Sequence, residues 1–235
     1  TIASGGNGTT FGTCSQSGGA GACSSSTRAL FAGGYSGGAN TIEFIEIQTL
    51  GNAVDFGDII TRSSSQYMSA CQSPTRGFFM GSGDSTYSAL IDYVNFGAKG
   101  NTTDFGDLVV ARRSLTALAN NTRGIWAGGA TPAMREEIDY ATIATVGNAT
   151  DFGNLTDPRR NPAVGSITSK TRGVFAGGNP GSSPLYTDRI DYVTIASAGN
   201  ATDFGDLSAT RGYMAKGQSC SVTRGLLQGG LEPTT

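Results

Sequence analysis

Aspartates that could bind a metal ion recur along this chain, each directly before a Phe-Gly pair. A second acid follows three residues later in most copies, and paired carboxylates are ligands that Ca²⁺ and Mg²⁺ prefer. The repeated aspartates are Asp55, Asp104, Asp151 and Asp203. In one copy, however, Asn154 takes the place of the second acid. We therefore expect these aspartates to cap turns through the backbone, and we predict no metal site.

Histidine is absent from all 235 residues. Its absence excludes Ser-His-Asp catalysis, histidine general bases and histidine-bearing metal sites. The four cysteines show no CxxC spacing, so we expect small buried thiols. A Cys14–Cys23 disulfide is the alternative for two of them, and geometry must decide it. With no catalytic constellation in the sequence, we predict a protein that is not an enzyme and needs no cofactor.

Arginine recurs in a first series, within a TRG element, as Arg28, Arg76, Arg123, Arg172 and Arg224. Acids recur in step with this series as Glu43, Asp92, Asp139 and Asp191. One cation and one anion per copy predict internal ion pairs, because a buried charge needs a partner. Arg224 has no such acid in its copy, so we expect it to pair with Glu232 or to be exposed.

A second arginine series follows the second acid (or Asn154) of each copy by four or five residues, as Arg62, Arg112, Arg159 and Arg211. Arg113 and Arg160 double the charge in two copies. Two interpretations are open for this series. These arginines either donate hydrogen bonds to carbonyls of neighbouring strands, or they gather into a site for a carboxylate, a sulfate or an acidic sugar.

Both series belong to a repeat that fills the chain. The Phe after each repeated aspartate falls at Phe56, Phe105, Phe152 and Phe204, with a worn copy at Phe11. These positions and the TRG arginines both recur at intervals of about 45–52 residues. Two independent markers that keep the same register indicate five copies of one unit.

The sequence of one unit predicts four short strands. In the clearest copy the strands are expected at 171–178, 189–196, 201–207 and 212–220, separated by Gly, Asn, Asp and Ser. No window of helical length keeps an apolar stripe. A repeated, four-stranded antiparallel unit of this length is typical of a propeller blade. The sequence therefore predicts an all-β fold, a five-bladed β-propeller.

The two ends of the chain share the fifth unit. Thr1–Asn7 matches Thr194–Asn200, which lies in the middle of a unit, so we expect both termini to build one blade and to remove exposed strand edges. The predicted blades of this single domain are 212–235 with 1–12, 17–58, 63–107, 113–154 and 160–206. Because the chain starts within a unit and without Met, we expect a processed chain or one domain of a longer protein.

The segment Arg112–Gly129, RRSLTALANNTRGIWAGG, followed by Glu136–Leu155, EEIDYATIATVGNATDFGNL, resembles a kelch-type repeat. This chain departs from the kelch pattern by using Phe where kelch repeats usually carry Trp. The whole chain is more closely similar to the kelch-like repeats of bacteriophage virion proteins, such as tail fibres and other appendages. The resemblance implies a virion or extracellular module, present in many copies, that binds host-surface glycans or proteins or other virion proteins.

The segments after the double glycines vary while their flanks stay constant; they are 35–41, 84–90, 130–137 and 179–189. Their contact-capable residues are Tyr35, Tyr87, Met134, Arg135, Tyr186 and Arg189. In antiparallel blades these loops share a face with the second arginine series, so we predict ligand binding on that face. Plain exposed linkers are the alternative interpretation. A soluble carbohydrate-binding lectin is the alternative function, and it should repeat the same aromatic and polar residues in every blade.

Composition limits the partners. The net charge is −2 and only 14% of residues are charged, so we expect no nucleic-acid partner. The sequence has no apolar stretch of about 18 residues, so we expect no membrane insertion.

Overall fold

The computed structural model describes residues 8–16, 20–34, 40–60, 66–83, 87–161, 163–214, 224–227 and 229–232. Sequence predictions at Tyr35, Arg62 and Cys220, and the N-terminal match at Thr1–Asn7, lie outside these residues. Every described secondary-structure element is a β-strand, which confirms the all-β class.

Sixteen of the strands form four antiparallel sheets of four strands each. The first sheet is β1 (Gly21–Ser24), β2 (Arg28–Ala32), β3 (Thr41–Glu46) and β4 (Val54–Asp58). The second is β5 (Ser69–Gln72), β6 (Arg76–Met80), β7 (Leu90–Asn95) and β8 (Thr103–Asp107). The third is β9 (Thr116–Ala119), β10 (Arg123–Ala127), β13 (Glu137–Thr142) and β14 (Thr150–Asn154). The fourth is β15 (Ala163–Thr168), β16 (Arg172–Ala176), β17 (Thr187–Thr194) and β18 (Thr202–Arg211).

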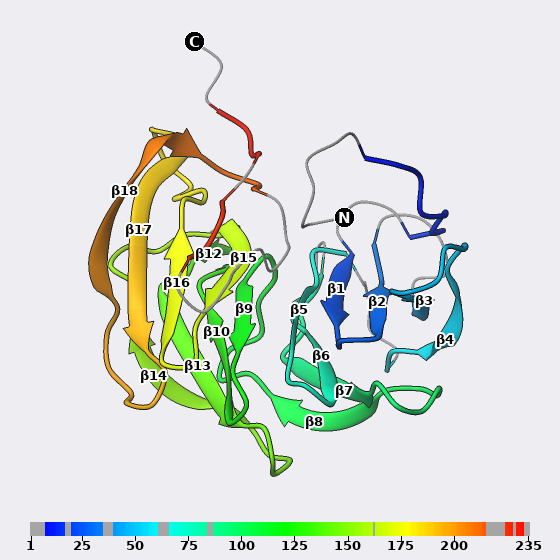
Figure 1. The fold of residues 1–235 in the computed structure, drawn as a ribbon. Coiled ribbons are helices and arrows are strands. Elements are labelled where there is room, and N and C mark those ends of the chain that lie inside the picture. The colour runs from blue at the N-terminus through cyan, green and yellow to red at the C-terminus, as the bar shows by residue number, and fades with distance from the viewer. Residues whose placement is uncertain are drawn as a thin grey trace.

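The sheets are arranged around a common centre (Figure 1). The first strand of each sheet lies innermost and the fourth lies at the periphery, while β1, β5, β9 and β15 contact one another in sequence. A two-stranded hairpin, β11 (Ala130–Thr131) with β12 (Ala133–Met134), is added after β10. The TRG turn lies at one end of the second strand of each sheet. A double glycine lies at the other end in three sheets, and Gly81-Ser82-Gly83 lies there in the second sheet.

The hydrophobic core lies between neighbouring sheets rather than within one sheet. Phe105 of the second sheet, for example, is 2% exposed and packs in one cluster with Trp126 and Ile143 of the third. Comparable clusters join the first sheet to the second and the third to the fourth. Burying such a side chain contributes about 1.5–3 kcal/mol. Phe56, Phe105 and Phe152, each after a repeated aspartate, therefore hold neighbouring units together.

A backbone clasp accompanies each packed Phe. The amide of Gly147 donates to the carbonyl of Phe105 (2.7 Å), and the amide of Asp107 donates to Asn148 Oδ1 (3.1 Å). Gly106 has a φ of 141°, and a Cβ there would meet the Gly147 carbonyl at 2.5 Å. This close approach explains why the Gly-Asn turn and the Phe-Gly pair recur together in the sequence.

The same clasp repeats at the other junctions. The corresponding amide–carbonyl pairs are Gly51 with Phe11, Gly100 with Phe56, and Gly199 with Phe152. The worn copy at Phe11 thus lies against the first sheet as a fourth strand would. The repeated aspartates act locally, because the carboxylates of Asp104, Asp151 and Asp203 each accept the amide two residues later, as the turn-capping interpretation requires.

Candidate functional site

Arg112 of the second series is held inside the protein. Its Nη2 lies 2.9 Å from Asp139 Oδ2, and the two side chains are 0% and 1% exposed. The same nitrogen donates to the carbonyl of Trp126, and the amide of Val109 donates to the Asp139 carboxylate. Burial is the largest influence on this pair: it raises the pKa of Asp139 and lowers that of Arg112, while their mutual attraction acts in the opposite direction. The pair therefore ties the connection after β8 to β13.

Arg159 repeats this arrangement one unit later. Its Nη2 lies 2.7 Å from Asp191 Oδ2, and both side chains are 0% exposed. Thr156 Oγ1 donates to the other carboxylate oxygen at 2.7 Å. The anion-site interpretation is therefore wrong for Arg112 and Arg159, because protein groups enclose both guanidinium groups.

The predicted pairing of TRG arginines with the recurring acids is also wrong. Asp139 and Asp191 pair instead with Arg112 and Arg159, which lie in the connections from the preceding sheets. The unit before Glu43, around Phe11, has no such arginine. Glu43 instead accepts hydrogen bonds from Cys14 Sγ (3.0 Å) and the amide of Ser15 (2.9 Å). Glu232 pairs with Arg211 at 2.9 Å. Arg224 is exposed, which was the second of the two outcomes expected for it.

The TRG arginines bridge sheets in another way. Arg76 Nη1 donates to the carbonyl of Ile143, and Arg123 Nη1 donates to the carbonyl of Ile195, both at 2.8 Å. Each guanidinium also lies 4.7 Å from the centroid of a tyrosine ring of its own sheet, Tyr93 or Tyr140. Arg28 donates in the same way to the carbonyl of Phe96. Their role is structural: a carbonyl and a ring are the partners of Arg76 and Arg123, whereas Arg28 also pairs with Glu46 through its Nε at 2.8 Å.

Accessible contact groups gather at the double-glycine end of the sheets. We call this set the loop surface; it comprises Tyr67, Tyr87, Arg113, Met134, Arg135 and Arg189. Its centre is Arg113, whose Cζ lies 5.1 Å from the Tyr67 ring and 5.7 Å from the Tyr87 ring. All three side chains are partly exposed. A guanidinium beside two phenol rings offers hydrogen-bond donors and apolar faces together.

The loop surface continues across the next two sheets. Arg113 pairs through its backbone with Ala130 of the β11–β12 hairpin, which presents Met134. Met134 covers Gly181, where a Cβ would come within 2.8 Å of Met134 Cγ. The surface thus extends from the second sheet to the loop before β17.

Two ion pairs border this surface. Arg135 pairs with Glu137, and Arg189 Nε lies 2.8 Å from Asp157 Oδ2. The Arg189 and Asp157 side chains are 42% and 50% exposed, so solvent screens them and a ligand can reach them. Exposed pairs of this kind contribute at most about 1 kcal/mol, so a partner can displace them at small cost.

The structure moves one predicted contact residue out of the candidate site and adds two others. Tyr186 is only 6% exposed, because its ring packs on Gly212 and edge-on to Tyr213 at 6.1 Å. The residues that sequence reasoning missed are Tyr67 and Arg113. The doubled arginine at Arg113 was the available signal, whereas nothing in the sequence placed Tyr67 beside it.

The described cysteines Cys14, Cys23 and Cys71 are all free, so the alternative of a Cys14–Cys23 disulfide is wrong. Cys23 and Cys71 are buried as expected, and burial raises both pKa values, that of Cys71 to about 12. Cys14 is exposed.

We expect a maleimide at about pH 8 to label Cys14 in the native protein and to label Cys23 and Cys71 only after unfolding, because the reactive species is an accessible thiolate. Peptide mass spectrometry measures the labelling at each site, and a Cys14→Ser variant serves as the control. Native labelling of Cys71 would contradict the packing between the second and third sheets.

Within the described part of the chain, no group of three or more His, Cys, Asp or Glu side chains is placed to hold a metal ion. No helix among the described residues is long and apolar enough to cross a membrane. No known protein-family model matches the chain, and no curated protein matches its sequence.

Proposed function

We propose that the chain is a five-bladed, kelch-like β-propeller in which the two ends share the fifth blade. Three observations support the ring. Arg113 pairs with Ala130 and Arg160 with Asn179 in isolated bridges, and Gly212 pairs with Leu231 in the same way near the C-terminus. The double glycine at 229–230 has φ values of 67° and 97°, close to the 60° and 115° of the pair at 177–178. The Phe11 clasp on Gly51 supplies the fourth-strand contact of such a blade.

The function that the site supports best is adhesion or docking without catalysis, in a bacteriophage virion. The observation that carries this proposal is the loop surface itself: partly exposed aromatic and basic side chains on a scaffold whose units otherwise repeat. Loops on a rigid scaffold are the usual place for recognition. The partners would be host-surface glycans or proteins, or other virion proteins, in an extracellular or virion setting.

A shallow surface suits multivalent binding. Each contact of this kind is weak, but many copies displayed on one particle multiply their effect through effective concentration. The resemblance to phage appendage repeats supports such a display. Variation among the loops, set against the constant clasps, favours contacts with one particular partner.

A propeller lectin is the second candidate. The observation that favours it is the Arg113 guanidinium beside Tyr67 and Tyr87, because aromatic faces stack on sugar rings and guanidinium groups donate to hydroxyls. The third and fourth sheets replace this cluster by different residues, Met134 and Arg189. A sugar site would therefore occupy one position in the ring and would not repeat.

The test is a glycan array and a host-cell pull-down with the purified chain beside a loop-surface variant, Tyr87→Ala, Met134→Ala, Arg189→Ala. A matched control variant changes exposed residues at the opposite, TRG end: Thr75→Ala, Asn121→Ala, Lys170→Ala. We expect the parent chain and the control variant to bind with similar affinity. The loop-surface variant should bind about tenfold or more weakly, since three small contributions add to at least about 1.4 kcal/mol. Equal loss in both variants would contradict the assignment of the face. Binding to glycans alone would select the lectin.

A further inference from the structure

The fourth sheet lacks the cover that the other sheets have. Phe204 is 56% exposed, whereas Phe56, Phe105 and Phe152 are 2–3% exposed. A Cβ at Gly153 would meet the Gly199 carbonyl at 2.5 Å, but a Cβ at Gly205 would meet nothing within 4 Å. Among the described copies of the Phe-Gly pair, the copy in β18 is thus the one with no Gly-Asn turn placed against it.

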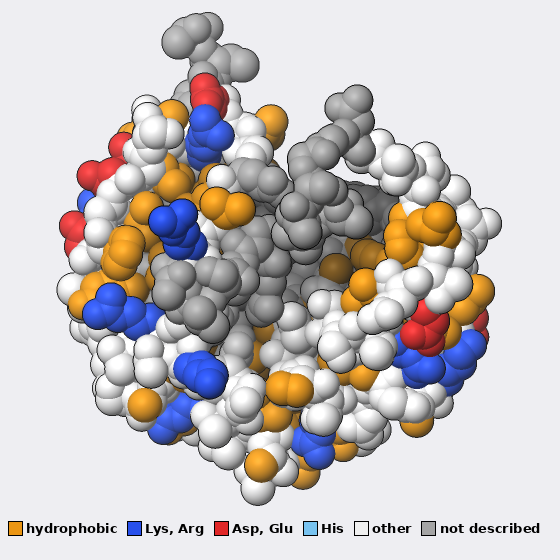
Figure 2. Space-filling view, viewed as in Figure 1, with side chains coloured by type: hydrophobic (Ala, Val, Ile, Leu, Met, Phe, Trp, Pro, Cys, Tyr) orange, Lys and Arg blue, Asp and Glu red, His pale blue; other side chains and the backbone are white. Residues whose placement is uncertain are grey.

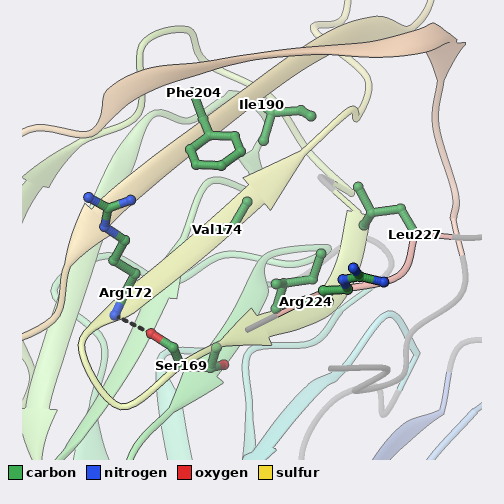
Figure 3. A pocket seen from close by; sticks show the side chains of 10 residues that line it. Ser169, Arg172, Val174, Ile190, Phe204, Arg224 and Leu227 are labelled. Carbon is green, nitrogen blue, oxygen red and sulfur yellow. Dashed lines mark hydrogen bonds between the residues drawn. The ribbon is translucent and has the colours of Figure 1, made fainter. Parts of the chain in front are cut away.

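An open cavity of about 380 Å³ lies on this face. Figure 3 shows Arg172, Val174, Ile190 and Phe204 on one side of it and Leu227 on the other. Apolar side chains also gather over β16–β18 in the space-filling view (Figure 2). A cavity of this size with mostly apolar walls fits large aliphatic side chains, because water gains few hydrogen bonds there.

The equivalent space between the third and fourth sheets shows what such a groove holds. Phe152 packs in one cluster with Val193 and Ile195. The carbonyl of Ile195 accepts Arg123 Nη1, and the amide of Gly199 donates to the carbonyl of Phe152 at 2.6 Å. The filling segment is therefore the turn that follows β17, with an aliphatic residue followed four positions later by glycine.

The next residue completes that clasp. Asn200 Oδ1 accepts the amide of Asn154 at 3.1 Å, as Asn148 Oδ1 accepts the amide of Asp107 one junction earlier. In the fourth sheet the position of Asn154 is taken by Asp206, and that of Arg123 by Arg172. The Arg172 guanidinium lies 4.8 Å from the Tyr192 ring centroid, close to the 4.7 Å between Arg123 and Tyr140.

We propose that residues Ile2–Asn7 of this same chain bind this groove. The sequence TIASGGN at Thr1–Asn7 is identical to TIASAGN at Thr194–Asn200 in six of seven positions, so Ile2, Gly6 and Asn7 correspond to Ile195, Gly199 and Asn200. In this register the Ile2 side chain covers Phe204 and its carbonyl accepts Arg172. The inference rests on the five-unit ring proposed above, and it is independent of the adhesive role.

The N-terminal segment of the same chain is a better candidate for the groove than that of a second copy, because of where the residues after Asn7 lie. The amide of Gly51 already donates to the carbonyl of Phe11 (3.1 Å), and the amide of Ala53 to the carbonyl of Thr13 (2.8 Å). The residues just after Asn7 are therefore fixed at the position of a fifth unit. A segment tethered there reaches a high effective concentration at the groove, which a free partner must match.

The test follows amide hydrogen exchange at single residues in the full-length chain. We expect the Asp206 amide to be protected, and Asn7→Ala to speed its exchange by about tenfold, the effect of one lost hydrogen bond. The matched control is Asn200→Ala, which should speed exchange at Asn154 and leave Asp206 unchanged. Light scattering beside gel filtration reports whether the protein is monomeric.

Two results would overturn the inference. An Asp206 amide that exchanges freely, with no response to Asn7→Ala, would mean that the groove stays open. Protection that falls on dilution of a dimer would assign the groove to a second copy. Neither result touches the adhesive proposal, because that proposal depends on binding by the loop surface and fails only if the binding experiment fails.

Discussion

Replacing Asp139 with Ala is expected to lower the free energy of unfolding by about 3–5 kcal/mol. The change leaves the Arg112 guanidinium charged at a position that is 0% exposed, and it removes the acceptor of the Val109 amide. A buried charge without its partner loses hydration and gains nothing in return. Denaturant unfolding followed by circular dichroism measures the difference.

The control for this prediction is Asp157→Ala, which breaks the half-exposed pair with Arg189 and should cost at most about 1 kcal/mol. A double variant, Arg112→Met with Asp139→Leu, should recover much of the loss, since apolar residues of similar volume need no partner. If Asp139→Ala stayed within about 1 kcal/mol of the parent, the pair would not be buried in solution.

Phe105→Ala is expected to cost about 3–5 kcal/mol, because the side chain is 2% exposed and the neighbouring sheets cannot collapse into the space it leaves. Its ring lies edge-on to Phe78 at 5.4 Å and to Tyr93 at 6.0 Å, and both contacts are lost. The ring also fills the boundary between the second and third sheets, so the loss should lower the stability of both together. Thermal and denaturant unfolding should show one destabilised transition.

Val109→Ala is the matched control for Phe105, since this side chain is four residues away and 53% exposed. It should change the free energy of unfolding by no more than about 0.5 kcal/mol. Two separate transitions in Phe105→Ala, with one at the parent's midpoint, would show that the sheets unfold independently and that the core between them contributes little.

The strands were predictable because each one carries its own pattern. The expected strand 189–196 corresponds to β17, Thr187–Thr194, and the expected strand 171–178 contains β16, Arg172–Ala176. Both are short runs of β-branched and aromatic residues that end at turn residues. Such signals are local, so they do not depend on how the units pack.

Partners across units were not predictable in the same way. One cation and one anion per unit correctly indicated buried ion pairs, but the repeat contains two arginines and nothing local says which one reaches the acid. The pair Arg112–Asp139 forms because the connection from one sheet passes over the third strand of the next. The prediction that Tyr186 is a contact residue is wrong for a related reason. Gly212, on which its ring packs, lies beyond the end of its own sheet.

The clasp between a Phe-Gly pair and the next Gly-Asn turn has a consequence for the evolution of the chain. Because the four junctions at Phe11, Phe56, Phe105 and Phe152 present the same backbone donor and acceptor, a unit can follow another without a new interface having to arise. Gene duplication or recombination within the repeat would therefore yield chains whose neighbouring units already match. If the ends share a unit as proposed, a circular permutant, cut in another double-glycine loop and joined across the present ends by a suitable linker, would keep every junction.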